Sequence, residues 1–313
     1  MTKNQTRFLV LMLAVLLVAA PALTMSSHES KIYVDDDASG SQDGSSDHPY
    51  GTIEKALEKA DDDTEIHISN GYYRENIKIK DGVEIYGESK SGVVIEAEDD
   101  DDPTVIMKDD TVLDKVTVKG GKYGIEVGDG GKASVISCII KDNHKGGIYI
   151  QDDGTKKSKM VSLSKNEIRD NDGTGIYSGK RKLSLTENKI KNNEGDGIDI
   201  EKGSKAWIAD NDIEKNDKSG MKLRIDGSEI WTKHNSIKNN KREGVEISFK
   251  GQYGRIDIAK TKIEDNKRFG VARVQRAAVS GSAGLWNKYL TFDPRNVISS
   301  NGSGGISPVI IIK

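Results

Sequence analysis

A short motif recurs along most of the chain, and it constrains the fold more than any other feature of the sequence. Each copy begins with a residue that is most often Asn, then has an aliphatic residue two positions later, a second Asn, and a Gly followed by another apolar residue. Residues 166–176 read Asn-Glu-Ile-Arg-Asp-Asn-Asp-Gly-Thr-Gly-Ile, and residues 188–198 read Asn-Lys-Ile-Lys-Asn-Asn-Glu-Gly-Asp-Gly-Ile. The seven copies place this glycine at Gly147, Gly175, Gly197, Gly220, Gly244, Gly270 and Gly305. Such a period is typical of a repeat architecture.

The residues around each copy alternate between apolar and polar. Leu183 and Leu185 precede one Asn, and Ile198 and Ile200 follow one Gly. This alternation predicts short strands with one inward face, and we expect Asn and Gly at the bends because they tolerate left-handed backbone conformations. A unit of about 23 residues is shorter than the roughly 30 residues of a strand-helix-strand crossover. We therefore predict an all-β, right-handed parallel β-helix whose coils stack about 4.8 Å apart, with each Asn able to hydrogen-bond to the Asn of the next coil.

The same pattern predicts how the two ends of the chain are organised. Residues 23–313 are expected to form a single solenoid domain of about ten coils, with residues 31–65 as the N-terminal cap and first strands. The segment Ile53–Ala60 has apolar residues at helical spacing after Thr52, which is a suitable N-cap, so a short helix should cover the first coil. Residues 275–294 lengthen the last repeat and are expected to be an insertion that folds back as C-terminal cover. The low aromatic content of 5% fits a narrow aliphatic interior.

The first 22 residues have the pattern of a secretory signal. Lys3 and Arg7 precede the apolar run Phe8–Ala20, and small residues follow up to Ala22, which is the order found in signal peptides. An uncleaved N-terminal anchor is the alternative, because the run is only slightly shorter than a membrane span. We predict that residues 1–22 are a signal peptide, that the protein is secreted, periplasmic or at the cell surface, and that no membrane span remains after cleavage.

The charge and the cysteine content limit which kinds of partner and cofactor the sequence predicts. The chain has 47 Lys and Arg residues interspersed with 50 Asp and Glu residues, which disfavours nucleic acid as a partner. Cys138 is the only cysteine, and we expect it to be a buried apolar residue. The histidines show no metal-ligand spacing, so neither a metal site nor a cofactor is predicted. The acidic runs Asp35–Asp37, Asp61–Asp63 and Asp99–Asp102 are interpreted as solvated loops, with loose Ca²⁺ binding as the alternative.

Segments near the N-terminus resemble a known family. Residues 48–57, His-Pro-Tyr-Gly-Thr-Ile-Glu-Lys-Ala-Leu, and residues 70–77, Asn-Gly-Tyr-Tyr-Arg-Glu-Asn-Ile, look like the first coils of pectinesterase-like proteins. The later repeats resemble the parallel β-helix repeats of the pectate-lyase-like superfamily of secreted right-handed β-helix proteins. The resemblance implies the fold but not the function, because this fold is found in lyases, hydrolases, esterases, epimerases and non-enzymes. The Asp-Pro-His motif of alginate epimerases and the Gly-His-Gly motif of polygalacturonases are absent from the sequence.

Because side chains fill the interior of such a solenoid, a ligand has to bind its outer face. The residue after each inward aliphatic residue belongs to an outward column, and two positions further along the strand the side chain points the same way. Rings, carboxylates and cations on adjacent coils suit an extended saccharide. We predict four ligand-binding residues in this column: Tyr149, Tyr177, Lys222 and Glu246. The alternative is a solvated sheet face whose opposite charges pair between coils.

Asp199, Glu201 and Arg224 are the candidate catalytic residues. Asp199 and Glu201 are two positions apart on one strand, a separation of about 6.6 Å, at the lower edge of the roughly 6.5–9.5 Å between the carboxylates of inverting glycosidases. A lyase would instead hold Ca²⁺ against a uronate with acidic residues and use Lys222 or Arg224 as the base. Paired surface charges are the alternative to both hypotheses.

Trp207 and Trp231 form a second surface feature. Each lies four residues before a repeat Asn, where other copies have Ser162, Ser184 and Asp257. The alternation places both indoles on the outside of neighbouring coils, which is costly unless they contact a ligand or a partner. We predict a sugar-stacking platform or a subunit contact. The alternative is a pair of tryptophans partly covered by the stems of Lys205 and Lys233.

Two functions remain open at this point. The first is an exported parallel β-helix protein that binds an acidic polysaccharide or cell-surface glycan on its outer sheet face. If it also processes that glycan, it would be a polysaccharide lyase or a glycoside hydrolase acting on uronate-containing glycans. The second is a non-catalytic structural or adhesive cell-surface protein. The sequence does not decide between enzyme and binding protein, name the glycan or give the oligomeric state.

Overall fold

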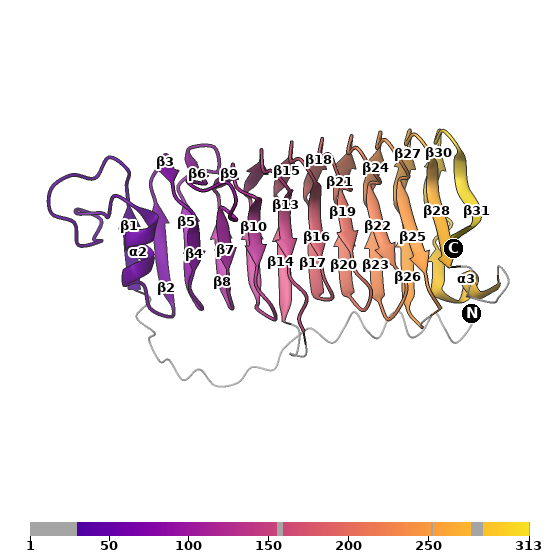
Figure 1. Cartoon of the computed structure of the whole chain (residues 1–313), viewed down its shortest axis with the longest axis horizontal. Coiled ribbons are helices and arrows are strands. Elements are labelled where there is room, and N and C mark those ends of the chain that lie inside the picture. The colour runs from indigo at the N-terminus through magenta and orange to yellow at the C-terminus, as the bar shows by residue number, and fades with distance from the viewer. Residues whose placement is uncertain (1–29, 155–158, 252, 277–283, 313) are drawn as a thin grey trace.

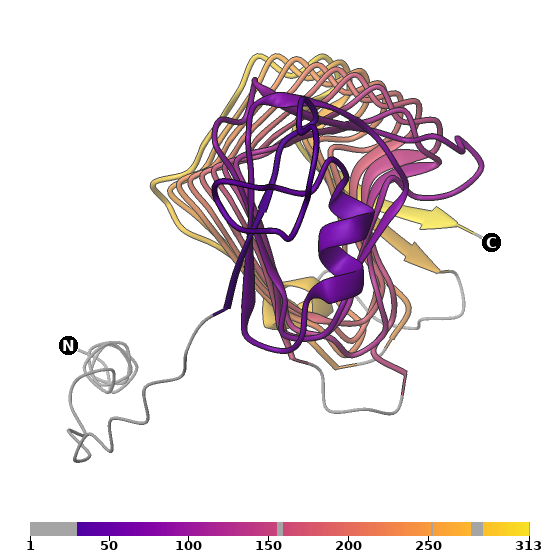
Figure 2. The ribbon, with the colours of Figure 1, turned by 90° about the vertical axis from the view of Figure 1, so that its left-hand side faces the viewer.

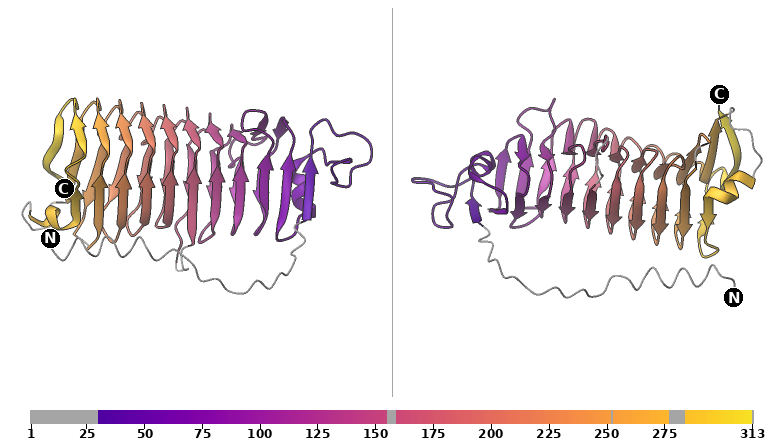
Figure 3. Two further views of the ribbon diagram at one scale, coloured as in Figure 1. Left: turned by 180° about the vertical axis from the view of Figure 1, so that it is seen from behind. Right: turned by 90° about the horizontal axis from the view of Figure 1, so that it is seen from below.

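The computed structural model describes residues 30–154, 159–251, 253–276 and 284–312. Short strands wind into an elongated solenoid whose strands run across its long axis (Figures 1 and 3). In the described residues they form three sheets, one of eleven strands and two of ten, and the strands pair in parallel, as in the pairs β17–β20 and β16–β19. The architecture is the all-β parallel β-helix that the sequence predicts.

We call the three sheets A, B and C in the order in which each coil passes through them. Sheet A contains β1 (Ser30–Val34), β2 (Thr64–Ile68), β5 (Glu84–Gly87), β8 (Thr111–Asp114), β11 (Ala133–Ile136), β14 (Met160–Ser164), β17 (Lys182–Thr186), β20 (Lys205–Ala209), β23 (Glu229–Lys233), β26 (Arg255–Ala259) and β29 (Leu290–Phe292). Sheet B contains β3 (Gly71–Arg74), β6 (Val93–Glu96), β9 (Thr117–Lys119), β12 (Ile139–Lys141), β15 (Glu167–Arg169), β18 (Lys189–Lys191), β21 (Asp212–Glu214), β24 (Ser236–Lys238), β27 (Lys262–Glu264) and β30 (Val297–Ser299). Sheet C contains β4 (Ile77–Ile79), β7 (Val105–Met107), β10 (Tyr123–Val127), β13 (Gly146–Ile150), β16 (Thr174–Ser178), β19 (Ile198–Ile200), β22 (Met221–Arg224), β25 (Val245–Phe249), β28 (Phe269–Arg276) and β31 (Gly304–Ile312).

The period-two alternation places one face of each strand in a narrow aliphatic core. In β17, Leu183 and Leu185 are buried, and Ser184 between them faces outward. The same inward positions are buried on the neighbouring coils, so the core is a continuous column of Ile, Val and Leu side chains. Cys138 belongs to this core, and burial raises the pKa of its thiol to about 12, as expected for a cysteine that serves as a small apolar residue.

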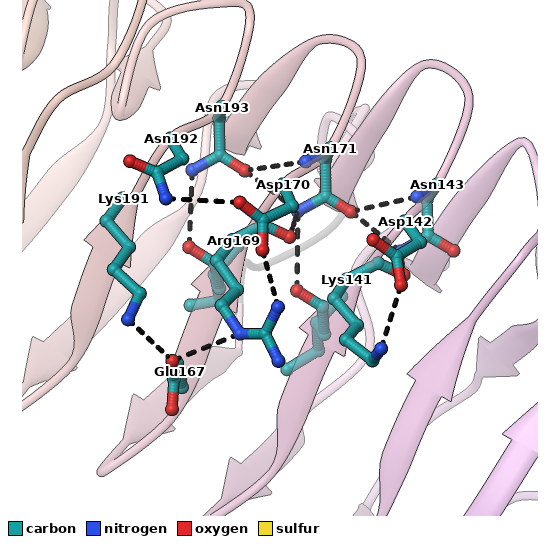
Figure 4. Close-up of polar contacts among 12 residues, drawn as sticks. Lys141, Asp142, Asn143, Glu167, Arg169, Asp170, Asn171, Lys191, Asn192 and Asn193 are labelled. Carbon is teal, nitrogen blue, oxygen red and sulfur yellow. Dashed lines mark hydrogen bonds and ion pairs between the residues drawn. The ribbon is translucent and has the colours of Figure 1, made fainter.

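Two rows of buried asparagines hold the coils in register. At the corner between sheets B and C, Asn143 donates from Nδ2 to Asn171 Oδ1 and Asn171 donates to Asn193 Oδ1, both at 2.8 Å (Figure 4). Asn193 continues the row by donating to Asn216 Oδ1 at 3.0 Å. A second row follows the corner between sheets A and B, where Asn188 donates to Asn211 at 3.0 Å. Each amide thereby satisfies buried hydrogen-bonding groups. The predicted contact of Asn with Asn is confirmed.

The repeat Asn and Gly residues have a different conformational role from the one predicted. The left-handed backbone position is the residue before the repeat Asn in most copies, including Lys165, Glu187 and Lys215, with φ between 56° and 59°. The repeat glycines have no positive φ; they are needed because the coils approach closely. A Cβ on Gly197 would lie 2.6 Å from the carbonyl oxygen of Gly220 and 2.6 Å from an Ile213 methyl group.

Helices lie at the two ends of the solenoid. Helix α2 (Ile53–Lys59) lies across the N-terminal end of the coil (Figure 2), and Thr52 Oγ1 accepts a hydrogen bond from the Lys55 N–H, which confirms the predicted N-cap. Its buried face includes Ile53 and Leu57. At the other end, within residues 275–294, lie α3 (Gly284–Tyr289) and β29, and the buried Trp286 donates to Gln275 Oε1 at 2.9 Å. Residues 277–283 of that predicted insertion lie outside the described residues.

Candidate functional site

The outward column predicted from the repeats lies on sheet C. Strand pairing sets its members side by side on consecutive strands, in the order Glu126, Tyr149, Tyr177, Asp199, Lys222 and Glu246. Glu201 follows Asp199 by two positions, and Arg224 follows Lys222 by two. The structure therefore brings the predicted ligand-binding residues Tyr149, Tyr177, Lys222 and Glu246 and the candidate catalytic residues onto one face.

Arg224 links the two candidate catalytic carboxylates. Its Nη1 donates to Asp199 Oδ1 and, at 2.8 Å, to the carbonyl oxygen of Ile200, and its Nη2 lies 3.2 Å from Glu201 Oε1. The Arg224 side chain is only 14% exposed. Burial opposes its charge, but the hydrogen bond and the negative charge of Asp199 outweigh burial and raise the Arg224 pKa. The guanidinium thus stays charged, which disfavours Arg224 as a base and favours a role in holding Asp199 and Glu201 in place.

Lys222 and Glu246 are the next two residues of the column, and they differ from Arg224 in exposure and in charge pairing. Lys222 Nζ lies 4.0 Å from Asp199 Oδ2, and the Lys222 side chain is about one third exposed. Glu246 pairs with Lys222 in the strand register. Burial raises the Glu246 pKa, and the charge of Lys222 opposes this shift only in part. Lys222 is therefore the cation of this cluster that a ligand can reach most directly, since Arg224 is occupied by two carboxylates.

A second buried carboxyl group, Asp196, precedes β19 beside this cluster. Its Oδ1 accepts the N–H of Ser219 at 2.8 Å, and burial raises its pKa. Ser219 in turn lies within hydrogen-bond distance of Glu243 on the next coil. The sequence prediction missed Asp196 and Glu243 because it considered only residues after the repeat glycine. Both stand immediately before that glycine, so the same frame could have identified them.

Three tyrosine rings stack beside the charged cluster. The ring centroids of Tyr123 and Tyr149 are 4.7 Å apart, those of Tyr149 and Tyr177 are 5.2 Å apart, and the rings are nearly parallel. Burial, and then the nearby negative charge of Glu201, raise the Tyr177 pKa. The stack therefore ends next to the Arg224 cluster. Tyr123 was not predicted because it lies outside the outward column, opposite Gly146 in the strand register.

Trp207 and Trp231 lie on a different face, sheet A. They are direct partners in the pairing of β20 with β23, as predicted. Trp207 is 42% exposed. Lys205 Nζ lies 5.5 Å from the centre of the Trp231 ring, so the Lys205 ammonium group lies over one indole, whereas the alternative interpretation expected the stems of Lys205 and Lys233 to cover the pair. The two tryptophans do not share a face with the sheet C cluster.

Among the described residues, two acidic runs bring carboxylates together. The three carboxylates of Asp35–Asp37, and likewise those of Asp99–Asp101, have oxygens within 4.8 Å of one another. Their side chains are largely exposed, and Asp36 and Asp99 already accept backbone N–H groups. These contacts are typical of solvated loops. None of the described helices is long and apolar enough to cross a membrane.

The fold and its repeats define the family. Residues 123–307 match the family described as "Right handed beta helix region". The match covers more than half of the chain, so the protein belongs to this family, and the solenoid is right-handed as predicted. The matched region includes sheet C strands β10 to β31, about eight turns, and strands β1 to β9 precede it.

Several solved structures share this architecture. The mannuronan C-5 epimerase AlgE4 A-module of Azotobacter vinelandii is 14% identical, with a TM-score of 0.56, and the match covers 90% of this chain and 100% of that one. Pectate lyase Pel9A is 15% identical, with a TM-score of 0.51 and coverage of 90% and 77%. The Dettilon tailspike protein (gp208) is 13% identical, with a TM-score of 0.51 and coverage of 88% and 68%. At these identities the likeness shows the fold alone. None of the curated proteins matches the chain.

Proposed function

We propose that this protein is an exported β-helix protein that binds an acidic polysaccharide along the outer face of sheet C. The observation that carries the proposal is the continuous line of aromatic and charged side chains on that face. The Tyr123–Tyr149–Tyr177 stack leads directly into the cluster of Asp199, Glu201, Lys222 and Arg224. The names of the structural neighbours, an epimerase of mannuronan and a pectate lyase, support a polysaccharide as the ligand class. Export rests on the signal-like residues 1–22, which lie outside the described residues.

Each residue on the outer face of sheet C would make a different kind of contact with the polysaccharide. The last ring of the stack, Tyr177, offers a flat apolar surface for a sugar ring. Lys222 is a partly exposed cation that can pair with a uronate carboxylate. Glu201, whose side chain is about one third exposed, can accept hydrogen bonds from sugar hydroxyls. Arg224 is a positioning residue that holds Glu201 and Asp199.

Processing of the glycan by Asp199, Glu201 and Arg224 stays a prediction. Their contacts favour binding over acid–base chemistry, because the two carboxylates share one charged guanidinium and a general acid needs a carboxyl group whose environment keeps it protonated. Turnover of polygalacturonate or alginate by the protein, lost in Asp199→Asn and Glu201→Gln, would establish catalysis.

Affinity electrophoresis of the protein through gels containing polygalacturonate or fully methyl-esterified pectin tests the proposal. We expect retardation by polygalacturonate and much weaker retardation by the uncharged ester, because Lys222 loses its carboxylate partner. Tyr177→Ala and Lys222→Gln should each weaken polygalacturonate binding by about tenfold, the range expected for a central contact.

Arg169 on sheet B provides the matched control. It is also an outward arginine held by two carboxylates, with Nε 3.1 Å from Glu167 and Nη1 2.5 Å from Asp170 (Figure 4), but it lies on another face. Arg169→Gln should bind like the parent. Equal binding of both pectins, or of the parent and Tyr177→Ala, would contradict the proposal. Absence of binding to every uronate polymer would favour the structural or adhesive alternative.

A further inference from the structure

The outer face of sheet A carries an uncharged strip between two aromatic groups. One column of outward residues contains Ser134, Ser162, Ser184 and Trp207, and the column beside it contains Ile136, Ser164, Thr186 and Ala209. In these described strands neither column has a charged side chain. The equivalent column on sheet B is Lys141, Arg169, Lys191, Glu214, Lys238 and Glu264. The strip therefore differs from this sheet B column, which has a charged side chain at every position.

A ring-lined cavity lies at the N-terminal end of the strip. Tyr33, His67 and Tyr86 stand side by side on β1, β2 and β5, with ring centroids 5.5 Å and 5.6 Å apart. They line a cavity of about 430 Å³ together with Ser69, Glu88 and Lys115. That volume suits a small ligand or one segment of a polymer.

Asp114 is the next residue after Tyr86 in this column. Its side chain is 15% exposed, its buried Oδ1 has no hydrogen-bond partner in the described residues, and burial raises its pKa. A buried oxygen without a partner is costly, and a ligand hydroxyl that reached it would remove that cost. The Tyr86 ring thus lies next to the Asp114 carboxyl group, whose Oδ1 can accept a hydrogen bond from a ligand hydroxyl.

An exposed indole lies at the other end of the strip. Lys205 covers Trp231 and pairs with Glu229 at 2.9 Å, whereas Trp207 remains 42% exposed. On its N-terminal side, Trp207 adjoins the small side chain of Ser184. Five inter-strand steps separate β5 from β20, a distance of about 24 Å at the spacing of paired strands.

We propose that the outer face of sheet A is a second binding surface, for an uncharged, hydroxyl-rich polysaccharide chain that lies along the solenoid axis. The sugar rings contact Trp207 at one end and the Tyr33–His67–Tyr86 cavity at the other, and serine and threonine hydroxyls line the path between them. This proposal is independent of ligand binding by sheet C.

The composition of the strip favours a glycan over a protein partner. Protein interfaces are depleted in Ser and Ala and are built around an apolar centre, whereas the centre of this strip is serine and threonine. Neither of the two columns contains a cation that could pair with an anionic polymer; Lys182 and Lys205 lie at the first position of their strands, beside the strip. A neutral glycan matches the strip in both respects, because its hydroxyls pair with side-chain hydroxyls and its apolar ring faces pack on Trp207.

Affinity electrophoresis of the full chain through gels containing hydroxyethyl cellulose, galactomannan, xyloglucan or a soluble β-1,3-glucan tests the proposal. We expect at least one of these uncharged polymers to retard the protein. Trp207→Ala, Tyr86→Ala and the charge-introducing Ser184→Asp should each weaken that binding by about tenfold. Oligosaccharides too short to span about 24 Å should bind more weakly than longer ones of the same linkage. The bound polymer should also shift the tryptophan emission of the parent but not that of Trp207→Phe.

Lys191→Gln on sheet B is the control and should bind the neutral polymer like the parent. Trp207→Ala should keep the polygalacturonate binding of the parent, so failure of the sheet A proposal is distinguishable from failure of the sheet C proposal. Three results would overturn the sheet A proposal: no retardation by any of the four polymers, retardation unaffected by Trp207→Ala and Ser184→Asp, or sedimentation showing a dimer that Trp207→Ala dissociates. The last result would assign the face to a second copy of the chain.

Discussion

At the scale of single residues, the coils reach the spacing of hydrogen-bonded strands because the repeat glycines have no side chain where neighbouring coils approach most closely. A Cβ on Gly197 would meet the Gly220 carbonyl oxygen, the Ile213 methyl group and Asn216 Nδ2 within 2.9 Å. Real Cβ atoms do not approach backbone atoms so closely, and a packed interior does not yield cheaply. The repeat glycine is therefore a requirement of stacking and not of backbone conformation.

Substitution of Gly197 tests this explanation. Gly197→Ala should lower the free energy of unfolding by about 1–3 kcal/mol, the usual cost of overpacking, as measured by urea denaturation. Gly305 occupies the same repeat position in the last coil, where the nearest atom to an added Cβ is 3.6 Å away. Gly305→Ala should change stability much less. Equal losses in the two variants would show that the glycine is needed for another reason.

The sequence predicted the architecture better than it predicted the roles of individual residues. The alternation and the repeated Asn were sufficient to predict the strands, the coil and the Asn rows, because these features follow from a period that is visible in the amino-acid sequence. The left-handed positions were not predictable in this way, because the residue before each Asn varies, with Lys165, Glu187 and His234 among its occupants. The Arg224 cluster was predicted as a group, but which atoms pair depends on side-chain conformation. The cavity at Tyr33, His67 and Tyr86 was missed although the alternation marks His67, between Ile66 and Ile68, as outward.

At the scale of elements, the strands of sheet C carry both an ion-paired carboxyl group and a partly buried one without an ion pair in the described part of the chain. Asp199 on β19 is held by Arg224, whereas Glu246 on β25 is partly buried without an ion pair to the described residues. Burial raises the Glu246 pKa above its ordinary value of 4.5. Between pH 4.5 and the raised pKa, the folded protein therefore keeps a proton on Glu246 that the unfolded chain has released. As a result, the free energy of unfolding decreases as the pH rises from about 4.5 through the raised pKa.

The variant Glu246→Gln should remove this loss. Relative to the parent, its free energy of unfolding should increase between pH 4.5 and pH 7, as measured by urea denaturation across that range. Glu96→Gln is a control of opposite sign, because hydrogen bonds from Lys119 and Tyr72 lower the Glu96 pKa. That carboxylate stabilises the fold above about pH 4.5 and the contribution is lost as the pH falls, so Glu96→Gln should be less stable than the parent at neutral pH. A pH-independent difference between Glu246→Gln and the parent would contradict the explanation.

At the scale of the whole molecule, one coil geometry produces three faces of different chemistry. Sheet B is covered by ion pairs, such as Glu167 with Arg169 and Lys191 (Figure 4). Sheet C combines stacked tyrosines with a charged cluster, and sheet A carries the uncharged strip. Because outward residues do not contribute to the core, each face can vary in composition without changing the coil. The two proposed glycan-binding surfaces can therefore differ in charge although they share one solenoid.

The solenoid is also nearly one-dimensional, since each coil contacts mainly its neighbours, and this determines what the N-terminal helix stabilises. Leu57 of α2 is only 5% exposed and packs with Ile53 into the end of the core.

Leu57→Ala should lower the free energy of unfolding by about 2–5 kcal/mol, and the loss of stability should be confined to the N-terminal coils. Hydrogen exchange measured by mass spectrometry should accelerate in β1 to β4 and remain unchanged in β19 to β25. Glu58→Ala, on the exposed side of the same helix, should leave both regions as in the parent. Acceleration of equal size along the whole solenoid would mean instead that the coils unfold as one cooperative unit and that α2 stabilises all of them.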